Sequence, residues 1–318
     1  MLDNLVFSLN ATMPIFLMMV VGFFLKKIHM LDEHSTSTIN KVVFRVFLPA
    51  LLFEDLAVQD FVSIWDSSFV GFCALATVIS IAIAAGIARF DKHPSDRGEF
   101  IQASFRSAAA TLGIAFMTNV YDNVAMVALM IIGSVPIYNI ISVLLLSVTA
   151  PDATKDGIIS SSLIKKTLKS LITNPIILSI LAGLVWSLLR LEQPVIMQKS
   201  ITYLGNVASP LALIGLGASF ELSDLKTKWK AIALVNFNKL FLFCLLFLPL
   251  GIYWGYRDDK LVALLIMLGS ATTSSSFIMA KNMGHKGTIS SAAVMTTTFL
   301  SSFTLTLWLF ILRTFGYI

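Results

Sequence analysis

Two stretches of small and hydroxyl-bearing residues carry the side chains best suited to hold a polar ligand within an otherwise apolar chain. They read SFRSAAATLGIAF (104–116) and IMLGSATTSSSF (266–277), and each falls inside a long apolar segment. A helix can be interrupted at membrane depth where protein or a water-filled cavity satisfies the freed backbone groups, and half-helix N-termini attract anions. The residues expected to line such an anion site are Thr111, Gly113, Thr272, Thr273, Ser274 and Ser275. The alternative is that these small residues only allow close helix packing.

Three cationic side chains, Arg45, Arg106 and Lys239, lie within apolar segments. Charges in such segments are costly and are therefore candidates for function. We expect Arg106 to be the favoured cation of the anion site and Lys239 to be a further polar contact. The alternative for all three is that the long side chain reaches back to the membrane surface and keeps its charge in water.

Prolines and asparagines within the apolar segments provide further candidates of lower specificity. Pro49 and Pro210 stand inside such segments, where a proline kinks a helix and frees a carbonyl oxygen. A purely structural kink explains them equally well. The asparagines added to the candidate substrate site are Asn139, Asn206 and Asn236.

Motifs for catalysis and for metal or nucleotide binding are missing from the sequence. It contains no Walker-type glycine loop, nucleophile elbow or His–Glu zinc motif. We therefore expect neither an enzyme nor an ATP-driven pump, with no catalytic residue, no cofactor and no bound metal. The net charge is +5, but the basic residues are scattered among short loops, so no nucleic-acid partner is expected.

The elements that must position the candidate site are membrane-spanning helices. Hydrophobic residues make up 57% of the 318 positions and charged residues only 13%, with a mean hydropathy of +0.85. A soluble domain carries about 25% charged residues, so lipid must be the solvent of this chain. We expect an all-α membrane protein with ten transmembrane helices. Their expected ranges are about 5–25, 39–57, 67–90, 100–118, 123–149, 171–190, 197–220, 231–254, 260–280 and 288–313.

The chain repeats itself at an offset of 161 residues. Pro14 then falls on Pro175, Gly22 on Gly183, Pro49 on Pro210, Thr111 on Thr272 and Phe116 on Phe277. We therefore expect two five-helix repeats, at 1–150 and 171–318, joined by a cytoplasmic linker at 151–170. An odd number of helices in each repeat inverts the second repeat relative to the first, as in many secondary transporters. Helices 4 and 9 would then be the crossed, interrupted pair.

Loop charges predict the orientation of the chain in the membrane. Most of the lysines and arginines outside the spans fall in the odd-numbered loops, which places those loops inside the cell. Both termini would then lie outside, in a multi-pass protein of the plasma membrane.

Four segments resemble the auxin efflux carrier family of membrane transporters. They are INKVVFRVFLPALLFEDLA (39–57), FRSAAATLGIA (105–115), LGNVASPLALIGLGAS (204–219) and SSAAVMTTTFLSSFTLTL (290–307). The resemblance covers nearly the whole chain. It implies a five-plus-five inverted repeat with crossed helices 4 and 9, a scaffold formed by helices 1, 2, 6 and 7, and a moving domain formed by the rest. It also implies a carboxylate cargo, because bacterial members are associated with malate and malonate and plant members with auxin.

The chain departs from the family pattern at the predicted crossing. Family members often have an asparagine two residues after the arginine of helix 4 and prolines at the two breaks. This chain has Ala108 and Ala115 in helix 4, and Thr272 and Thr273 in helix 9.

These observations favour a secondary active transporter of an organic anion that works by alternating access. The anion would be a mono- or dicarboxylate such as malate, malonate or an auxin-like acid. The partners expected are this anion, the lipid bilayer, protons as a candidate coupling ion and a second copy of the chain. One alternative is a cation/proton or sodium-coupled exchanger, which would require an acidic residue at the centre of a span. A non-transporting membrane sensor, the other alternative, would require an attached signalling domain.

Overall fold

The computed structural model describes residues 14, 17–58, 65–90, 94–109, 125–150, 173–219 and 222–318, and all secondary structure within them is helical. Residues 17–27 are helical. The next elements are α2 (Glu33–Val42), the π-helix η1 (Val43–Phe47), α3 (Leu48–Ala57), α4 (Ser67–Ala88), α5 (Pro94–Phe105) and α7 (Ala125–Val148). The later ones are α9 (Pro175–Leu188), α10 (Val195–Ser219), α11 (Leu222–Phe237), the π-helix η2 (Asn238–Leu242), α12 (Phe243–Tyr253), α13 (Asp258–Gly269), α14 (Ser274–Asn282) and α15 (Thr288–Thr314).

Within the described residues, seven helical segments are long and apolar enough to cross a membrane. They are Glu33–Ala57, Ser67–Ala88, Met126–Val148, Val195–Ser219, Lys228–Tyr253, Asp258–Asn282 and Thr288–Thr314. Each corresponds to one of the predicted spans, and the shorter apolar helix Pro175–Leu188 corresponds to an eighth. The predicted spans 5–25 and 100–118 extend beyond the described residues, and the predicted linker 151–170 lies outside them. A total of ten helices therefore stays a prediction.

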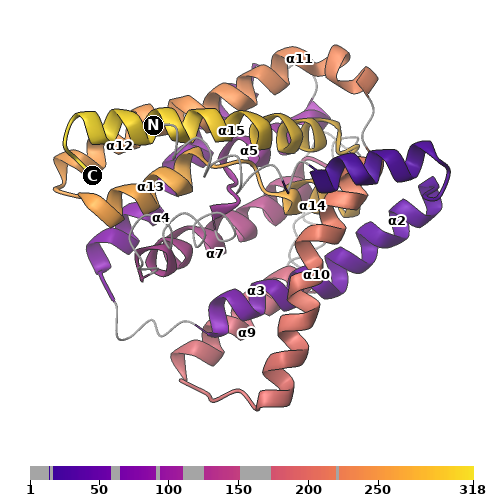
Figure 1. Ribbon diagram of the computed structural model, residues 1–318, viewed down its shortest axis with the longest axis horizontal. Helices are drawn as coiled ribbons and strands as arrows, with labels where there is room; N and C mark the ends of the chain where they lie inside the picture. The colour runs from indigo at the N-terminus through magenta and orange to yellow at the C-terminus, as the bar shows by residue number, and fades with distance from the viewer. Residues whose placement is uncertain are drawn as a thin grey trace.

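The helices form two packed groups (Figure 1). In the smaller group, which we call the α3–α9–α10 group, α3 packs against α9 and α10, and α10 also packs against α2 and residues 17–27. The larger group contains α4, α5, α7, α11, α12, α13 and α15. The short helix α14 lies between the groups, because it contacts α2, η1 and α10 on one side and α5 and α15 on the other.

Two close helix crossings within the smaller group are related by the 161-residue offset. A Cβ atom added at Gly22 would lie 2.1 Å from the carbonyl oxygen of Ile214, and one added at Gly183 would lie 2.8 Å from that of Phe53. Adding 161 converts Gly22 to Gly183 and Phe53 to Ile214. The two crossings are thus the same contact with the two halves of the chain exchanged, and glycine is needed at both because the backbones approach so closely.

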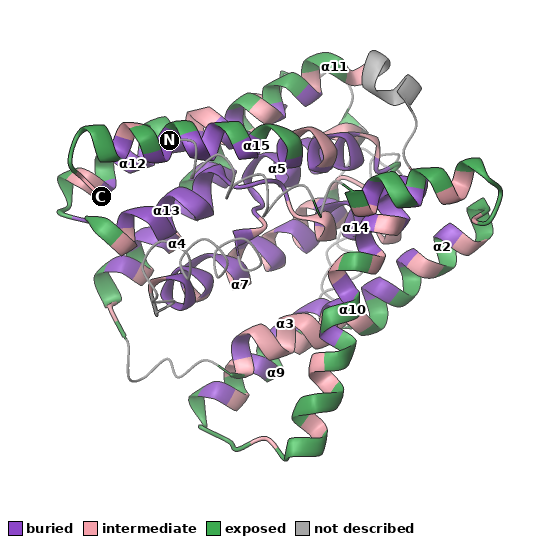
Figure 2. Cartoon of the chain, in the orientation of Figure 1, coloured by how far each residue is buried: buried purple, intermediate pink, exposed green. Residues whose placement is uncertain are grey.

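One apolar segment is broken in the middle. Helix α13 ends at Gly269, residues 270–273 are not helical, and α14 begins at Ser274. This segment, Asp258–Asn282, is the most deeply buried of the seven candidate spans, as the mostly purple α13 in Figure 2 shows. Helix α5 likewise ends at Phe105 and is followed by non-helical residues 106–108. Interruptions of this kind at membrane depth require buried surroundings, which both breaks have.

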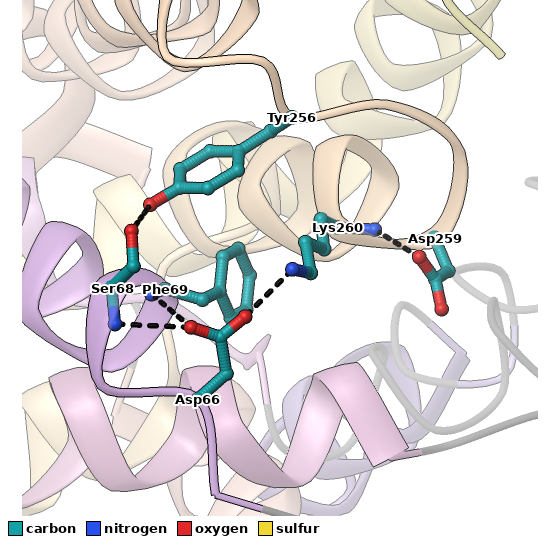
Figure 3. Close-up of polar contacts among 6 residues, drawn as sticks. All are labelled: Asp66, Ser68, Phe69, Tyr256, Asp259 and Lys260. Atoms are coloured by element: carbon teal, nitrogen blue, oxygen red, sulfur yellow. Dashed lines mark hydrogen bonds and ion pairs between the residues drawn. The ribbon is translucent and has the colours of Figure 1, made fainter.

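Polar contacts join neighbouring helices at one end of the larger group (Figure 3). Asp66 precedes α4 and accepts hydrogen bonds from the backbone N–H groups of Ser68 (3.0 Å) and Phe69 (3.1 Å). Its other carboxylate oxygen lies 2.6 Å from Nζ of Lys260 in the first turn of α13. The Ser68 hydroxyl also bonds the Tyr256 hydroxyl at 3.0 Å. The start of α4 and the start of α13 therefore lie at the same end of the molecule.

Candidate functional site

The two interrupted helices are hydrogen-bonded to each other at their breaks. The backbone N–H of Ala108 donates to the carbonyl oxygen of Ala271 at 2.8 Å. The hydroxyls of Ser107 and Ser270 are 2.7 Å apart, and the Thr272 hydroxyl donates to the carbonyl oxygen of Ala103 at 2.8 Å. The ends of α5 and α13 are therefore joined directly, which supports the predicted crossing of helices 4 and 9. Residues 110–118 of the predicted helix 4 lie outside the described residues.

Side chains replace the prolines that the family often has at this crossing. The backbone N–H of Thr272 donates to the hydroxyl of Thr297 on α15 at 2.9 Å. The amide of Gln102 on α5 donates to the carbonyl oxygen of Ser276 on α14 at 2.9 Å. A helix break frees backbone donors and acceptors that must find partners away from water. Hydroxyl and amide side chains supply those partners here, so the break in helix 9 forms without a proline.

Arg106 lies at the centre of the crossing and is only 1% exposed. Its guanidinium donates to the side-chain oxygen of Asn139 on α7 and to the hydroxyl of Ser275 on α14, both at 2.7 Å, and it also contacts the sulfur of Met279. The guanidinium carbon lies 5.3 Å from the centre of the Tyr138 ring. All these partners are neutral, and no described carboxylate is bonded to the guanidinium. Of the two alternatives for Arg106, the structure therefore disfavours a side chain that reaches the membrane surface, because its neutral partners hold it in the core.

The N-terminus of α14 adds positive potential beside Arg106. The helix begins at Ser274, one residue before the hydroxyl that accepts from Arg106. Its N-cap residue, Thr273, makes no side-chain capping bond, and the Thr273 hydroxyl instead lies 3.1 Å from that of Ser275. The N-terminus of a helix carries a partial positive charge and free N–H groups, both of which favour anions. The predicted residues Arg106, Thr273, Ser274, Ser275 and Asn139 thus lie together.

Lys239 is also fully buried, but it serves a different part of the crossing. Its Nζ donates to the carbonyl oxygens of Met267 (3.1 Å) and Leu268 (2.9 Å), which are at the C-terminal end of α13. The alternative that Lys239 reaches the membrane surface is therefore wrong. The π-helix η2 contains Lys239, just as η1 contains Arg45, and π-turns often mark functional sites.

Several predicted site residues lie outside the hydrogen-bond network at the crossing. Pro49 lies in the interior of the continuous helical segment Glu33–Ala57, directly after the π-helix η1. Asn206 and Pro210 are exposed on α10. The side-chain oxygen of Asn236 accepts a hydrogen bond from the Thr296 hydroxyl on α15 at 2.9 Å.

Two further predicted residues, Thr111 and Gly113, lie outside the described residues. Among the described residues no three side chains of His, Cys, Asp or Glu lie close enough together to hold a metal ion.

Four residues of the site were not expected from the sequence. Tyr138 and Met279 contact the Arg106 guanidinium, and Ser107 and Ser270 join the breaks. Helical spacing offers a signal for one of them, because Met279 is four residues after Ser275 and therefore lies on the same face of α14. The serines are not exact repeat mates at the 161-residue offset, so the repeat gives no indication of their pairing.

A polar cavity of about 450 Å³ opens between the α3–α9–α10 group and the end of α14. It is lined from the smaller group by α2, η1 and the end of α10, and from the other side by the end of α14. Its charged lining residues are Lys26, Glu33, Lys41, Arg45 and Lys281. Four cations and one anion give this cavity a positive charge. Arg45 is exposed here, in agreement with the expectation that its charge stays in water.

Comparisons with known proteins give three findings. A family profile described as "Membrane transport protein" matches residues 7–309. A protein named "Putative malonate transporter" from Rhizobium meliloti (strain 1021) is 32% identical over 142 residues, which is 44% of this chain and 44% of that protein. The structure of a sodium proton antiporter from Methanocaldococcus jannaschii superimposes with a TM-score of 0.66 at 15% sequence identity, over 96% of this chain and 97% of that one.

Proposed function

Because the chain belongs to the membrane transport protein family, which is the auxin efflux carrier family that its motifs resemble, we propose that it is a secondary active transporter of organic anions. The substrate is a mono- or dicarboxylate, bound at the crossing of the two interrupted helices. The protein is a multi-pass protein of the plasma membrane with both termini outside. It belongs to a family of transporters rather than enzymes.

The observation that carries this proposal is the buried guanidinium of Arg106 with neutral partners only. A buried charge is costly unless it is paired, and the described residues offer Arg106 no acidic partner. A substrate carboxylate supplies the missing negative charge and matches the planar fork of a guanidinium. The N-terminus of α14, which begins at Ser274, provides the second favourable contact for that anion.

The two crossings at Gly22 and Gly183 support an inverted repeat. Each pairs a helix of residues 1–150 with a helix of residues 171–318, and exchanging the halves converts one into the other. A two-fold relation between two five-helix units produces this pattern. We therefore retain ten helices in two units joined by the 151–170 linker as part of the proposal.

Alternating access would move the larger helix group against the α3–α9–α10 group. This division matches the scaffold of helices 1, 2, 6 and 7 that the resemblance implies. The basic cavity lies between the α3–α9–α10 group and the end of α14, where Lys41, Arg45 and Lys281 attract anions toward the crossing. We assign this end to the cytoplasm, because the odd-numbered loops meet there.

The antiporter fold by itself does not decide between anion and cation transport. At 15% identity the likeness shows the fold alone. The cations buried at the crossing, Arg106 and Lys239, favour an anion over a cation, because a cation site would need an acidic residue beside them. The name of the Rhizobium meliloti relative supports a short dicarboxylate such as malonate as the first substrate to test.

Uptake of labelled carboxylates into proteoliposomes tests this function. We expect malonate or malate to be transported by the native protein, with Arg106→Gln lowering uptake by a factor of about 30 or more, because removing one partner of a buried charge pair costs about 2–5 kcal/mol. Arg106→Lys should retain partial uptake. Arg313→Gln, a change at an exposed arginine of α15, is the matched control and should leave uptake unchanged. The proposal would be wrong if the native protein took up none of the carboxylates, or if Arg106→Gln took them up as fast as the native protein does.

A further inference from the structure

The break between α13 and α14 exposes the C-terminal end of a half-helix inside the protein. The last carbonyl groups of a helix have no partner within it and carry a partial negative charge. At α13 two of these carbonyls, those of Met267 and Leu268, both accept from Nζ of Lys239. In transporters with broken helices, half-helix C-termini of this kind coordinate the coupling cation. Here a side chain of the protein itself brings the cation.

The C-terminal end of α5, at the other break, has a different hydrogen-bond donor. The carbonyl oxygen of Ala103, near the C-terminal end of α5, accepts from the neutral hydroxyl of Thr272. Lys239 has Val78 as its repeat mate, so the ammonium has no counterpart in the first half. Among the described residues, the two half-helix ends thus have different donors: the α13 carbonyls accept from the Lys239 ammonium, and the Ala103 carbonyl of α5 accepts from a neutral hydroxyl.

The surroundings of the Lys239 ammonium are rich in oxygen and contain no described acidic partner. It lines a small cavity of about 10 Å³, large enough for one water molecule, together with the hydroxyls of Thr77, Ser80, Ser107 and Ser134. The Ser80 hydroxyl is buried without a hydrogen-bond partner. The titratable groups near Lys239 are the Cys244 thiol on α12 and the Tyr138 phenol on α7.

We propose that the Lys239 ammonium is a fixed substitute for a mobile coupling cation, so that transport by this protein does not require sodium. The ammonium occupies the α13 carbonyls permanently and stabilises the crossing without an ion from solution. Replacing Lys239 by a small residue would leave two carbonyl oxygens and neighbouring hydroxyls around an empty, negatively polarised space. That space has the oxygen ligands and the size to accept Na⁺. The variant should therefore become sodium-dependent.

Thermal unfolding of the purified protein tests the cation site without any substrate. We expect the Tm of the native protein to be the same in NaCl and in choline chloride of equal concentration. The Tm of Lys239→Ala should be lower in choline chloride and should rise by about 2 °C or more in NaCl, because an ion that binds only the folded state stabilises it. Lys239→Arg, which keeps a cation at the site, should show no sodium effect.

Carboxylate uptake gives the functional readout and rests on the function proposed above. Native uptake should be equal in sodium and choline media, whereas Lys239→Ala should lose at least a factor of about ten in choline and regain part of it in sodium. Lys239→Met, which fills the space without a charge, should be inactive in both media. Lys239→Ser adds a hydroxyl ligand and serves as the second small variant if the alanine variant does not fold.

Any one of three results would overturn the role of Lys239. Uptake by the native protein could depend on sodium, or Lys239→Ala could show native-like uptake in choline. The third is that neither the Tm nor the uptake of the Lys239→Ala and Lys239→Ser variants changes when sodium replaces choline. If the native protein moves no carboxylate, the proposed function fails. The thermal experiment would still decide whether Lys239 stands in for a cation.

Discussion

The backbone N–H of Ala108 bonds the carbonyl oxygen of Ala271 at 2.8 Å, which joins the two interrupted helices directly at their breaks. Each break frees backbone groups, and this bond lets one helix satisfy the other. A movement that separates the two helices would leave both groups without partners in a water-poor core. The crossing is therefore expected to move as one unit with the larger helix group during transport.

The Thr272 hydroxyl should be important for the stability of this crossing. Thr272→Val keeps the shape of the side chain but leaves the Ala103 carbonyl oxygen without its donor. A buried acceptor without a partner costs about 1–3 kcal/mol, so the Tm of the purified protein should fall. Thr272→Ser retains the hydroxyl and should remain close to the native protein. Equal Tm values for the valine and serine variants would contradict this assignment.

Alanine substitutions at the two close helix crossings should be strongly destabilising. A methyl group at Gly22 or Gly183 would meet backbone atoms of Ile214 or Phe53, and backbone cannot move aside as a flexible side chain can. Overpacking of this kind costs about 1–3 kcal/mol or more, and Gly22→Ala should be the worse variant because its contact is closer. Thermal unfolding in detergent measures the effect.

Gly71→Ala is the matched control for these two variants. Gly71 lies in α4 with no atom within 4 Å of an added Cβ. Alanine also restricts the unfolded chain more than glycine does, so this variant should be as stable as the native protein or slightly more stable. Loss of stability in Gly71→Ala as large as in Gly22→Ala would show that steric contact is not the cause.

Asn139→Asp should separate a substrate-binding role of Arg106 from a purely structural one. The new carboxylate would replace the amide oxygen that lies 2.7 Å from the guanidinium, and it would form an internal ion pair. Carboxylate uptake should then fall by a factor of about ten or more, while the Tm should stay the same or rise. Native-like uptake by Asn139→Asp would mean that the Arg106 charge does not bind substrate.

The Asp66–Lys260 ion pair predicts a dependence of stability on pH. The hydrogen bond from Lys260 holds the pKa of Asp66 below its ordinary value of 3.8, and the N–H groups of Phe69 and Ser68 act in the same direction. A carboxyl with a lowered pKa in the folded state stabilises that state above its ordinary pKa. The contribution is lost as the pH falls through the folded-state pKa. The pair is half-buried, so its contribution is modest, about 0.2–1 kcal/mol at neutral pH.

Two variants of Asp66 separate the ion pair from helix capping. Asp66→Asn can still accept from the start of α4 but loses the charge, so it should lose only the salt-dependent part. Asp66→Ala loses the helix cap as well and should lower the free energy of unfolding by about a further 0.5–2 kcal/mol. Tm values at pH 7, at low and high salt, distinguish the two. A loss in Asp66→Asn that high salt does not reduce would contradict the ion-pair contribution.

The helices were predictable from sequence, because apolar segments of this length have few other folds in lipid. The positions of Arg106 and the α14 serines at one crossing were also predictable, since the repeat pairs the two hydroxyl-rich stretches. The hydrogen-bond partners of Arg106 were less predictable from the sequence. Asn139 comes from α7, and its distance in sequence carries no signal of its contact with the guanidinium.

The conformation of Lys239 could not be predicted from sequence either. Its distance from the end of the predicted span allows the side chain to reach the surface, and only the break at Gly269 creates the carbonyl acceptors that hold it inside. The π-helices around Arg45 and Lys239 have no sequence signal that we recognise. Two cationic residues inside apolar segments thus have opposite environments: Arg45 is exposed, whereas Lys239 is buried because a neighbouring helix ends beside it.

The exchanged crossings at Gly22 and Gly183 have a consequence for biosynthesis. The helix that contains Gly22 makes its close backbone contact with α10, and α3 of the first half makes its close contact with α9 of the second half. Among the described residues, the nascent first half therefore lacks the partners of these two close crossings until the second half has been made. The helix that contains Gly22 can form its close crossing only after residue 214 has been inserted into the bilayer. Packing of the smaller helix group therefore requires both halves of the chain and is completed late in synthesis.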